Sequence, residues 1–135
     1  MRDSTLLLLD DSLEAYNNLK KLLGNKYVVH LVKSLSANIN EIICSLSPSI
    51  IIIDLMIEND SYQSLFLCKD IHKEFKSLPI IIWTKHSVDN LKDNIFVKND
   101  NNIFLCQKYV DDKKLIDIIE DLYNTLPHNK IMNTD

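Results

Sequence analysis

The sequence predicts an α/β protein with a parallel β-sheet covered by helices on both faces, and two observations carry this prediction. Five short apolar runs alternate with segments of helical length along the chain. The run "PSIIIID" at residues 48–54 holds four consecutive isoleucines, so neither face of that strand is polar. Strands that are apolar on both faces and alternate with helices are typical of a parallel sheet between two helical layers.

The N-terminal half of the chain alternates strands and helices, in the order strand 5–10, helix 13–24, strand 26–32, helix 36–46 and strand 49–54. In the first helix apolar residues such as Leu13 and Leu19 recur at helical spacing, and Gly24 is placed to cap its end. Ser36 is available as the N-cap of the second helix. The third strand is β-branched throughout, which favours an extended backbone.

The C-terminal half continues the alternation, in the order helix 61–75, strand 78–84, helix 88–96, strand 103–107 and helix 111–126. One face of the helix over 61–75 carries Leu65, Cys68 and Phe75. The last helix begins with aspartates, which the positive end of a helix dipole favours. In the last strand Phe104 and Leu105 should point to opposite faces of the sheet, because side chains alternate along a strand.

The composition fits one globular domain, expected over residues 1–126, followed by a flexible tail over 127–135. The chain of 135 residues is 46% hydrophobic and 25% charged, which is enough for a real core. Its net charge of −4 gives no electrostatic reason to bind nucleic acid or an anionic membrane surface. No run approaches the roughly 20 apolar residues that cross a bilayer, and the N-terminal apolar run is too short for a signal peptide, so we expect a cytoplasmic protein.

The cysteines favour the same compartment. Cys44, Cys68 and Cys106 each lie in an apolar segment, and no two of them have the spacing of a zinc site. We therefore expect all three to be buried, reduced thiols.

Polar residues follow four of the predicted strands, and because the carboxyl ends of parallel strands share one edge, this is where a ligand would bind. They are Asp10, Asp11, Asp54, Thr84 and Lys108. Three neighbouring carboxylates repel one another unless a cation offsets their charge, and Mg²⁺ prefers such oxygen ligands together with a phosphate oxygen. A lysine adds a fixed positive charge suited to a phosphoryl group. A single aspartate after a strand is more often a helix cap or a turn former, so only the joint arrangement points to chemistry.

These residues resemble the receiver domain of two-component response regulators. The segment "LLLLDDS" is similar to the first-strand acidic pair of that family, "PSIIIIDLM" to the strand that bears the phosphorylated aspartate, and "LPIIIWT" to the strand that ends in a hydroxyl residue. The resemblance covers roughly residues 4 to 126. It implies a doubly wound, flavodoxin-like (βα)5 domain with a five-stranded parallel sheet in the order 2-1-3-4-5.

The resemblance also implies a stand-alone phosphorylation switch that is not itself a conventional enzyme. Asp54 would accept a phosphoryl group from a histidine kinase or a histidine phosphotransfer protein, and the change would alter the binding of a downstream protein target. The remaining assignments are Mg²⁺ ligation by Asp10 (through water), Asp11, Asp54 and the backbone carbonyl of Met56, and phosphoryl binding by Thr84 and Lys108. Met56 offers no polar atom to orient water, so we expect slow autodephosphorylation.

Departures from the family pattern keep other functions open. Tyr109 stands where proline usually follows the lysine, Lys85 where a small residue is usual, and Leu105 where an aromatic residue is usual. They favour an alternative, an atypical pseudo-receiver that signals by protein binding without phosphorylation. A phosphatase with an aspartate nucleophile is a third alternative, but it requires an acid where this chain has Met56. A homodimer also stays open.

Overall fold

A computed structural model describes residues 4–34, 38–55, 61–85 and 102–125. In chain order its elements are β1 (Thr5–Leu9), α1 (Leu13–Leu23), β2 (Val28–Val32), α2 (Ile39–Leu46), β3 (Ile50–Ile53), α3 (Ser61–Glu74), β4 (Ile80–Thr84), β5 (Ile103–Gln107) and α5 (Asp112–Thr125). Every predicted strand within the described ranges is present, with ends that differ by up to two residues. The predicted helix over 88–96 and the tail over 127–135 lie outside the described residues.

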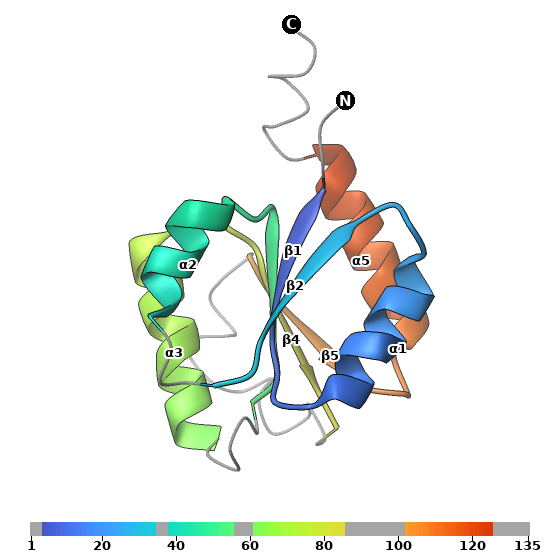
Figure 1. The fold of residues 1–135 in the computed structure, drawn as a ribbon, viewed down its shortest axis with the longest axis horizontal. Helices are drawn as coiled ribbons and strands as arrows, with labels where there is room; N and C mark the ends of the chain where they lie inside the picture. The colour runs from blue at the N-terminus through green and yellow to red at the C-terminus, as the bar shows by residue number, and fades with distance from the viewer. Residues whose placement is uncertain (1–3, 35–37, 56–60, 86–101, 126–135) are drawn as a thin grey trace, which may run out of the picture.

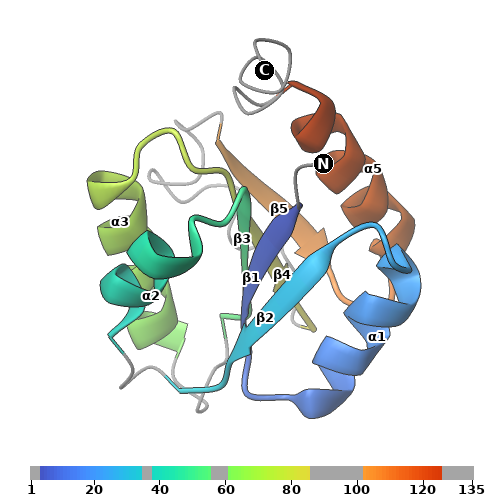
Figure 2. The same ribbon diagram turned by 45° about the horizontal axis from the view of Figure 1, so that its top comes forward.

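The five strands form one parallel sheet in the order β2-β1-β3-β4-β5. Helices α1 and α5 cover one face of the sheet, and α2 and α3 cover the other (Figure 1). The turned view in Figure 2 keeps the same two pairs on either side of the sheet. The predicted fold class, including the strand order that the resemblance implied, is confirmed.

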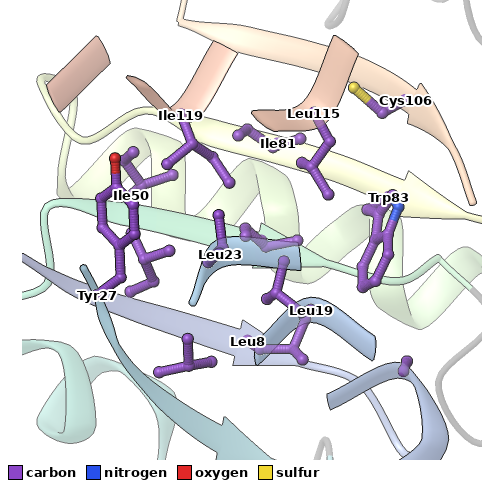
Figure 3. Packing of buried hydrophobic residues seen from close by; sticks show 14 residues of the cluster. Leu8, Leu19, Leu23, Tyr27, Ile50, Ile81, Trp83, Cys106, Leu115 and Ile119 are labelled. Atoms are coloured by element: carbon purple, nitrogen blue, oxygen red, sulfur yellow. The ribbon is translucent and has the colours of Figure 1, made fainter. Parts of the chain in front are cut away.

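Each face of the sheet packs against its own helical layer. Leu6, Leu8, Ile50 and Ile52 belong to the core under α1 and α5, which includes Leu115 and Ile119, whereas the alternating residues Leu7, Leu9, Ile51 and Ile53 belong to the core under α2 and α3. All four isoleucines of β3 have no exposed surface. Figure 3 shows the first core, with Tyr27 at one end and Trp83 at the other. Both faces of the central strands are therefore dry, as the isoleucine run predicted.

Helix ends follow local capping chemistry. Gly24 caps α1 with φ 67° and ψ −144°, as predicted, a combination that residues with a Cβ rarely adopt. The expected cap Ser36 is wrong, because α2 begins after Asn38, whose side-chain oxygen accepts a hydrogen bond from the amide of Glu41. Asn38 satisfies the first turn of the helix directly, so the helix starts nearer to its buried residues.

Two expectations about burial need correction. Leu13 is 55% exposed, and Ala15 instead joins Leu19 in the core, because α1 is rotated relative to the face that the leucine pattern indicated. Cys44 is also exposed, on the outer side of α2, whereas Cys68 and Cys106 are buried as expected, and all three thiols are free.

The last strand alternates as predicted. Phe104 packs against the core under α1 and α5, and Leu105 against the core under α2 and α3. No helix in the described part of the chain is long and apolar enough to cross a membrane.

Candidate functional site at the carboxyl edge of the sheet

The acidic pair follows β1 directly. The amide of Asp10 donates to the carbonyl of Val32 at 3.1 Å, so sheet pairing continues one residue past the strand. Asp10 has no exposed surface, and its Oδ1 accepts a hydrogen bond from the amide of Ser12, the N-cap of α1. Asp11 is exposed. Asp10 is thus both a turn former and a buried acid, while Asp11 keeps the acidic edge open to solvent.

Asp54 leaves β3 beside this pair. Its amide donates to the carbonyl of Leu9 at 2.9 Å, and the residue is 8% exposed. One carboxylate oxygen from each of Asp10, Asp11 and Asp54 lies within 4.8 Å of the others. The sequence prediction that these three acids converge is therefore correct in geometry.

Lys108 follows β5, which lies on the other side of β4 from β3, and its side chain extends to the acids. Its amide donates to the carbonyl of Thr84 at 2.8 Å, which continues the pairing of β4 with β5. Its Nζ lies 2.6 Å from Oδ2 of Asp10 and 3.5 Å from Oδ2 of Asp54. The side chain is only 2% exposed, so its ammonium contacts carboxylates in place of water. The pairing is what a buried lysine requires.

Thr84 is the last residue of β4 and has no exposed surface. Because β4 lies next to β3, Thr84 ends at the same edge as Asp54. Met56, whose carbonyl the resemblance assigned to Mg²⁺, lies outside the described residues. Of the other five predicted site positions, the structure brings four together in one cluster, Asp10, Asp11, Asp54 and Lys108, and places Thr84 at the end of the adjoining strand.

The electrostatics favour a cation. Burial raises the pKa of Asp10 above its ordinary value of 3.8; the hydrogen bond and charge of Lys108 lower it, and the charge of Asp54 raises it again. Burial therefore outweighs the lysine. Within the cluster that the structure describes, three carboxylates lie together with the ammonium of Lys108, and their hard oxygen atoms suit a divalent ion such as Mg²⁺.

The sequence interpretation missed the residues that surround Lys108. The ring of Trp83 lies 5.2 Å from its Nζ, and Trp83 Nε1 donates to Oδ1 of Asp112 at 3.2 Å. The hydroxyl of Tyr109 donates to Oε1 of Glu14 at 3.1 Å. Strand alternation was the available signal for Trp83, since it places the residue before Thr84 on the opposite face, under α1 and α5.

Many solved structures that share this architecture are response regulator receiver domains. The chain matches a receiver domain from Pseudomonas fluorescens Pf-5, part of an HD domain-containing protein, with a TM-score of 0.74 and 20% identity over 98% of this chain and 94% of that one. It matches the N-terminal receiver domain of a response regulator from Bacteroides fragilis with a TM-score of 0.71 and 18% identity, over 90% and 97%. This chain has the receiver-domain fold.

A response regulator from Thermotoga maritima shares the receiver fold too, with a TM-score of 0.72 and 16% identity over 92% of this chain and 100% of that one. No family model matches the sequence, and no curated protein matches it. Identities this low establish the receiver fold alone, so function has to be argued from the site.

Proposed function

We propose that this chain is a response regulator receiver that accepts a phosphoryl group on Asp54. The observation that carries the proposal is the clustering of three carboxylates with the buried ammonium of Lys108 at the carboxyl edge of a receiver fold. A structural ion pair would need one acid for one lysine. The two additional carboxylates raise the electrostatic cost of the site, and a phosphoryl-transfer role with a divalent cation accounts for them.

The chemistry is a phosphoryl transfer between two groups. A carboxylate oxygen of Asp54 attacks the phosphorus of a phosphohistidine on a histidine kinase or a phosphotransfer protein. A P–O bond forms, the P–N bond breaks, and the released imidazole nitrogen takes a proton from water. Carboxylates are competent nucleophiles for such transfers, which depend mainly on positioning and charge neutralisation.

The donor set fits Mg²⁺, whose ligands would be Asp11, Asp54 and the carbonyl of Met56, with Asp10 acting through water. When bound, the ion supplies positive charge that offsets the charge on the phosphoryl oxygens. Lys108 holds a second positive charge beside Asp54, and the hydroxyl of Thr84 donates to a phosphoryl oxygen. Phosphorylation would then bias the surface that a downstream target binds, in the cytoplasm, with or without formation of a homodimer.

A pseudo-receiver that signals only by protein binding is the second candidate. Lys108 favours it, because its Nζ lies 2.6 Å from Oδ2 of Asp10 and already offsets the charge of one acid. Such a pair could serve the fold alone.

Intact-mass spectrometry with acetyl phosphate and Mg²⁺ separates the two candidates. The receiver proposal expects a gain of one phosphoryl group that is lost in Asp54→Asn and retained in the control Asp70→Asn, an exposed aspartate on α3. No gain in the natural chain at any acetyl phosphate concentration would favour the pseudo-receiver.

A further inference from the structure

The turn after β5 is closed by hydrogen bonds at both ends. The amide of Asp111 donates to the carbonyl of Gln107 at 2.8 Å, and the amide of Gln107 donates back to Oδ2 of Asp111 at 3.0 Å. Inside this turn Tyr109 has φ 66°, in the left-handed region that residues with a Cβ seldom occupy. The backbone beside Lys108 therefore needs support from its surroundings to keep its path.

Asp112, the first residue of α5, supplies that support. Its Oδ1 accepts hydrogen bonds from the amide of Tyr109 at 3.0 Å and from Nε1 of Trp83 at 3.2 Å. Trp83 has no exposed surface, so its N–H group has no water to bond and depends on a protein acceptor. One carboxylate oxygen thus fastens the turn that carries Lys108 to the end of β4.

The indole ring also contacts the ammonium directly. Nζ of Lys108 lies 5.2 Å from the centre of the Trp83 ring, within the range of a cation–π interaction, and the residue is buried with it. A lysine side chain has a long flexible stem, and its compact charge is strongly hydrated, so an unrestrained ammonium would turn toward water. The indole ring and the carboxylates together hold the ammonium of Lys108 in one position.

We propose that Trp83 and Asp112 are positioning residues for Lys108. Asp112 fixes the left-handed turn and the orientation of the indole, and the indole fixes the ammonium beside Asp10 and Asp54. The inference rests on the proposed function in one respect only, namely that the positioned ammonium of Lys108 would bind a phosphoryl group on Asp54. The restraint itself exists before any phosphorylation and is measurable without it.

Amine labelling provides the test. Each variant of the full chain is treated briefly with an acetylating reagent, and acetylation of Lys108 is measured by peptide mass spectrometry. Asp112→Ala should raise the labelling rate of Lys108 by about fivefold or more, as expected when hydrogen bonds to a buried group are lost. Asp112→Asn keeps an acceptor oxygen and should restore protection. The control Asp117→Ala, at an exposed position on α5, should match the natural chain.

Alkylation of the buried Cys68 shows whether a variant has simply loosened. If Asp112→Ala exposes Cys68 as much as Lys108, or leaves Lys108 protected, the positioning role is wrong. A second pair examines the ring, since Trp83→Leu should expose Lys108 more than Trp83→Phe, which keeps an aromatic face; equal rates would contradict the cation–π contribution.

The phosphorylation rate with acetyl phosphate is then measured on the same variants. Altered labelling in a chain that is never phosphorylated would overturn the proposed function and leave the positioning role standing. If Asp112→Ala is phosphorylated as fast as the natural chain and its Lys108 is labelled no faster, the positioning role is overturned and the proposed function stands.

Discussion

Among single residues, Lys108 decides how much negative charge remains at the acidic edge. Its Nζ contacts Asp10 and Asp54, and burial nevertheless raises the pKa of Asp10 because the surrounding protein replaces water. Asp11 is the acid of this cluster that stays exposed. Of the three acids, Asp11 therefore offers the side from which a cation would approach the cluster.

Magnesium binding should follow from this charge. Adding Mg²⁺ well above its dissociation constant should raise the thermal unfolding temperature by several degrees, since a ligand at about 100 times its Kd stabilises by roughly 2.7 kcal/mol. Asp11→Ala should remove most of the shift, while Asp70→Ala on α3 should keep it. Differential scanning calorimetry with and without EDTA checks this, and equal shifts in both variants would count against the acidic cluster as the metal site.

The thiols offer a pH-dependent prediction. Burial raises the pKa of Cys68 to about 12 and that of Cys106 to about 11, from an ordinary value of 9.0. Both thiols therefore stay protonated at pH 8, and iodoacetamide should modify the exposed Cys44 alone until urea unfolds the chain.

The raised pKa values of the two thiols also determine how folding stability changes with pH. Because the folded pKa values are raised, the folded state holds these protons more tightly than the unfolded one. The thiols' contribution to stability is complete below about pH 9 and is lost as the pH rises toward 11 to 12. Mass spectrometry of alkylated peptides checks that Cys44 alone is modified. Rapid modification of Cys68 in the folded chain at pH 8 would contradict both this selectivity and the raised thiol pKa.

Among the elements, the strand ends place the site residues. Backbone pairing continues one residue beyond β1, β3 and β5, which anchors Asp10, Asp54 and Lys108 before their side chains make any contact. The positions of these three residues could be predicted from the sequence, since apolar runs fix where the strands end.

The surroundings of Lys108 could not be predicted, because the left-handed turn at Tyr109 and the hydrogen bond from Trp83 to Asp112 depend on tertiary contacts. Ser36 and Leu13 were misjudged for a similar reason, because local pattern does not fix a helix start or its rotation.

The end of α1 gives a prediction at this scale. Gly24 has φ 67° and ψ −144°, and a Cβ added there would meet nothing within 4 Å, so the cost of substitution is backbone strain alone. Gly24→Ala and Gly24→Asn should each lower the free energy of unfolding by about 1–3 kcal/mol. Urea denaturation measures it, with Asn25→Ala as the exposed neighbour that should change little; a neutral Gly24→Ala would show that the helix end rearranges.

At the scale of the whole molecule, the central strands hold the two cores together. Ile52 packs toward α1 and α5 and Ile53 toward α2 and α3, so β3 stabilises both layers, and Asp54 follows it directly. The same burial that fixes the fold fixes the proposed nucleophile. Stability and site geometry are therefore coupled through one strand.

Truncation in this strand should be costly. Ile52→Ala removes a side chain with no exposed surface and should lower the free energy of unfolding by about 2–5 kcal/mol. Val28→Ala, at a 45% exposed position of β2, is the control and should cost far less. Equal losses in chemical denaturation would mean that the two positions are buried alike in solution.

The most direct measurement locates the phosphoryl group. The chain is treated with acetyl phosphate and Mg²⁺, then with borohydride, which reduces an aspartyl phosphate to homoserine, and the peptides are sequenced by tandem mass spectrometry. The account expects homoserine at position 54 and none at positions 10, 11 or 70. Homoserine at position 10 or 11, or its absence throughout, would contradict the assignment of Asp54 as the phosphoryl acceptor.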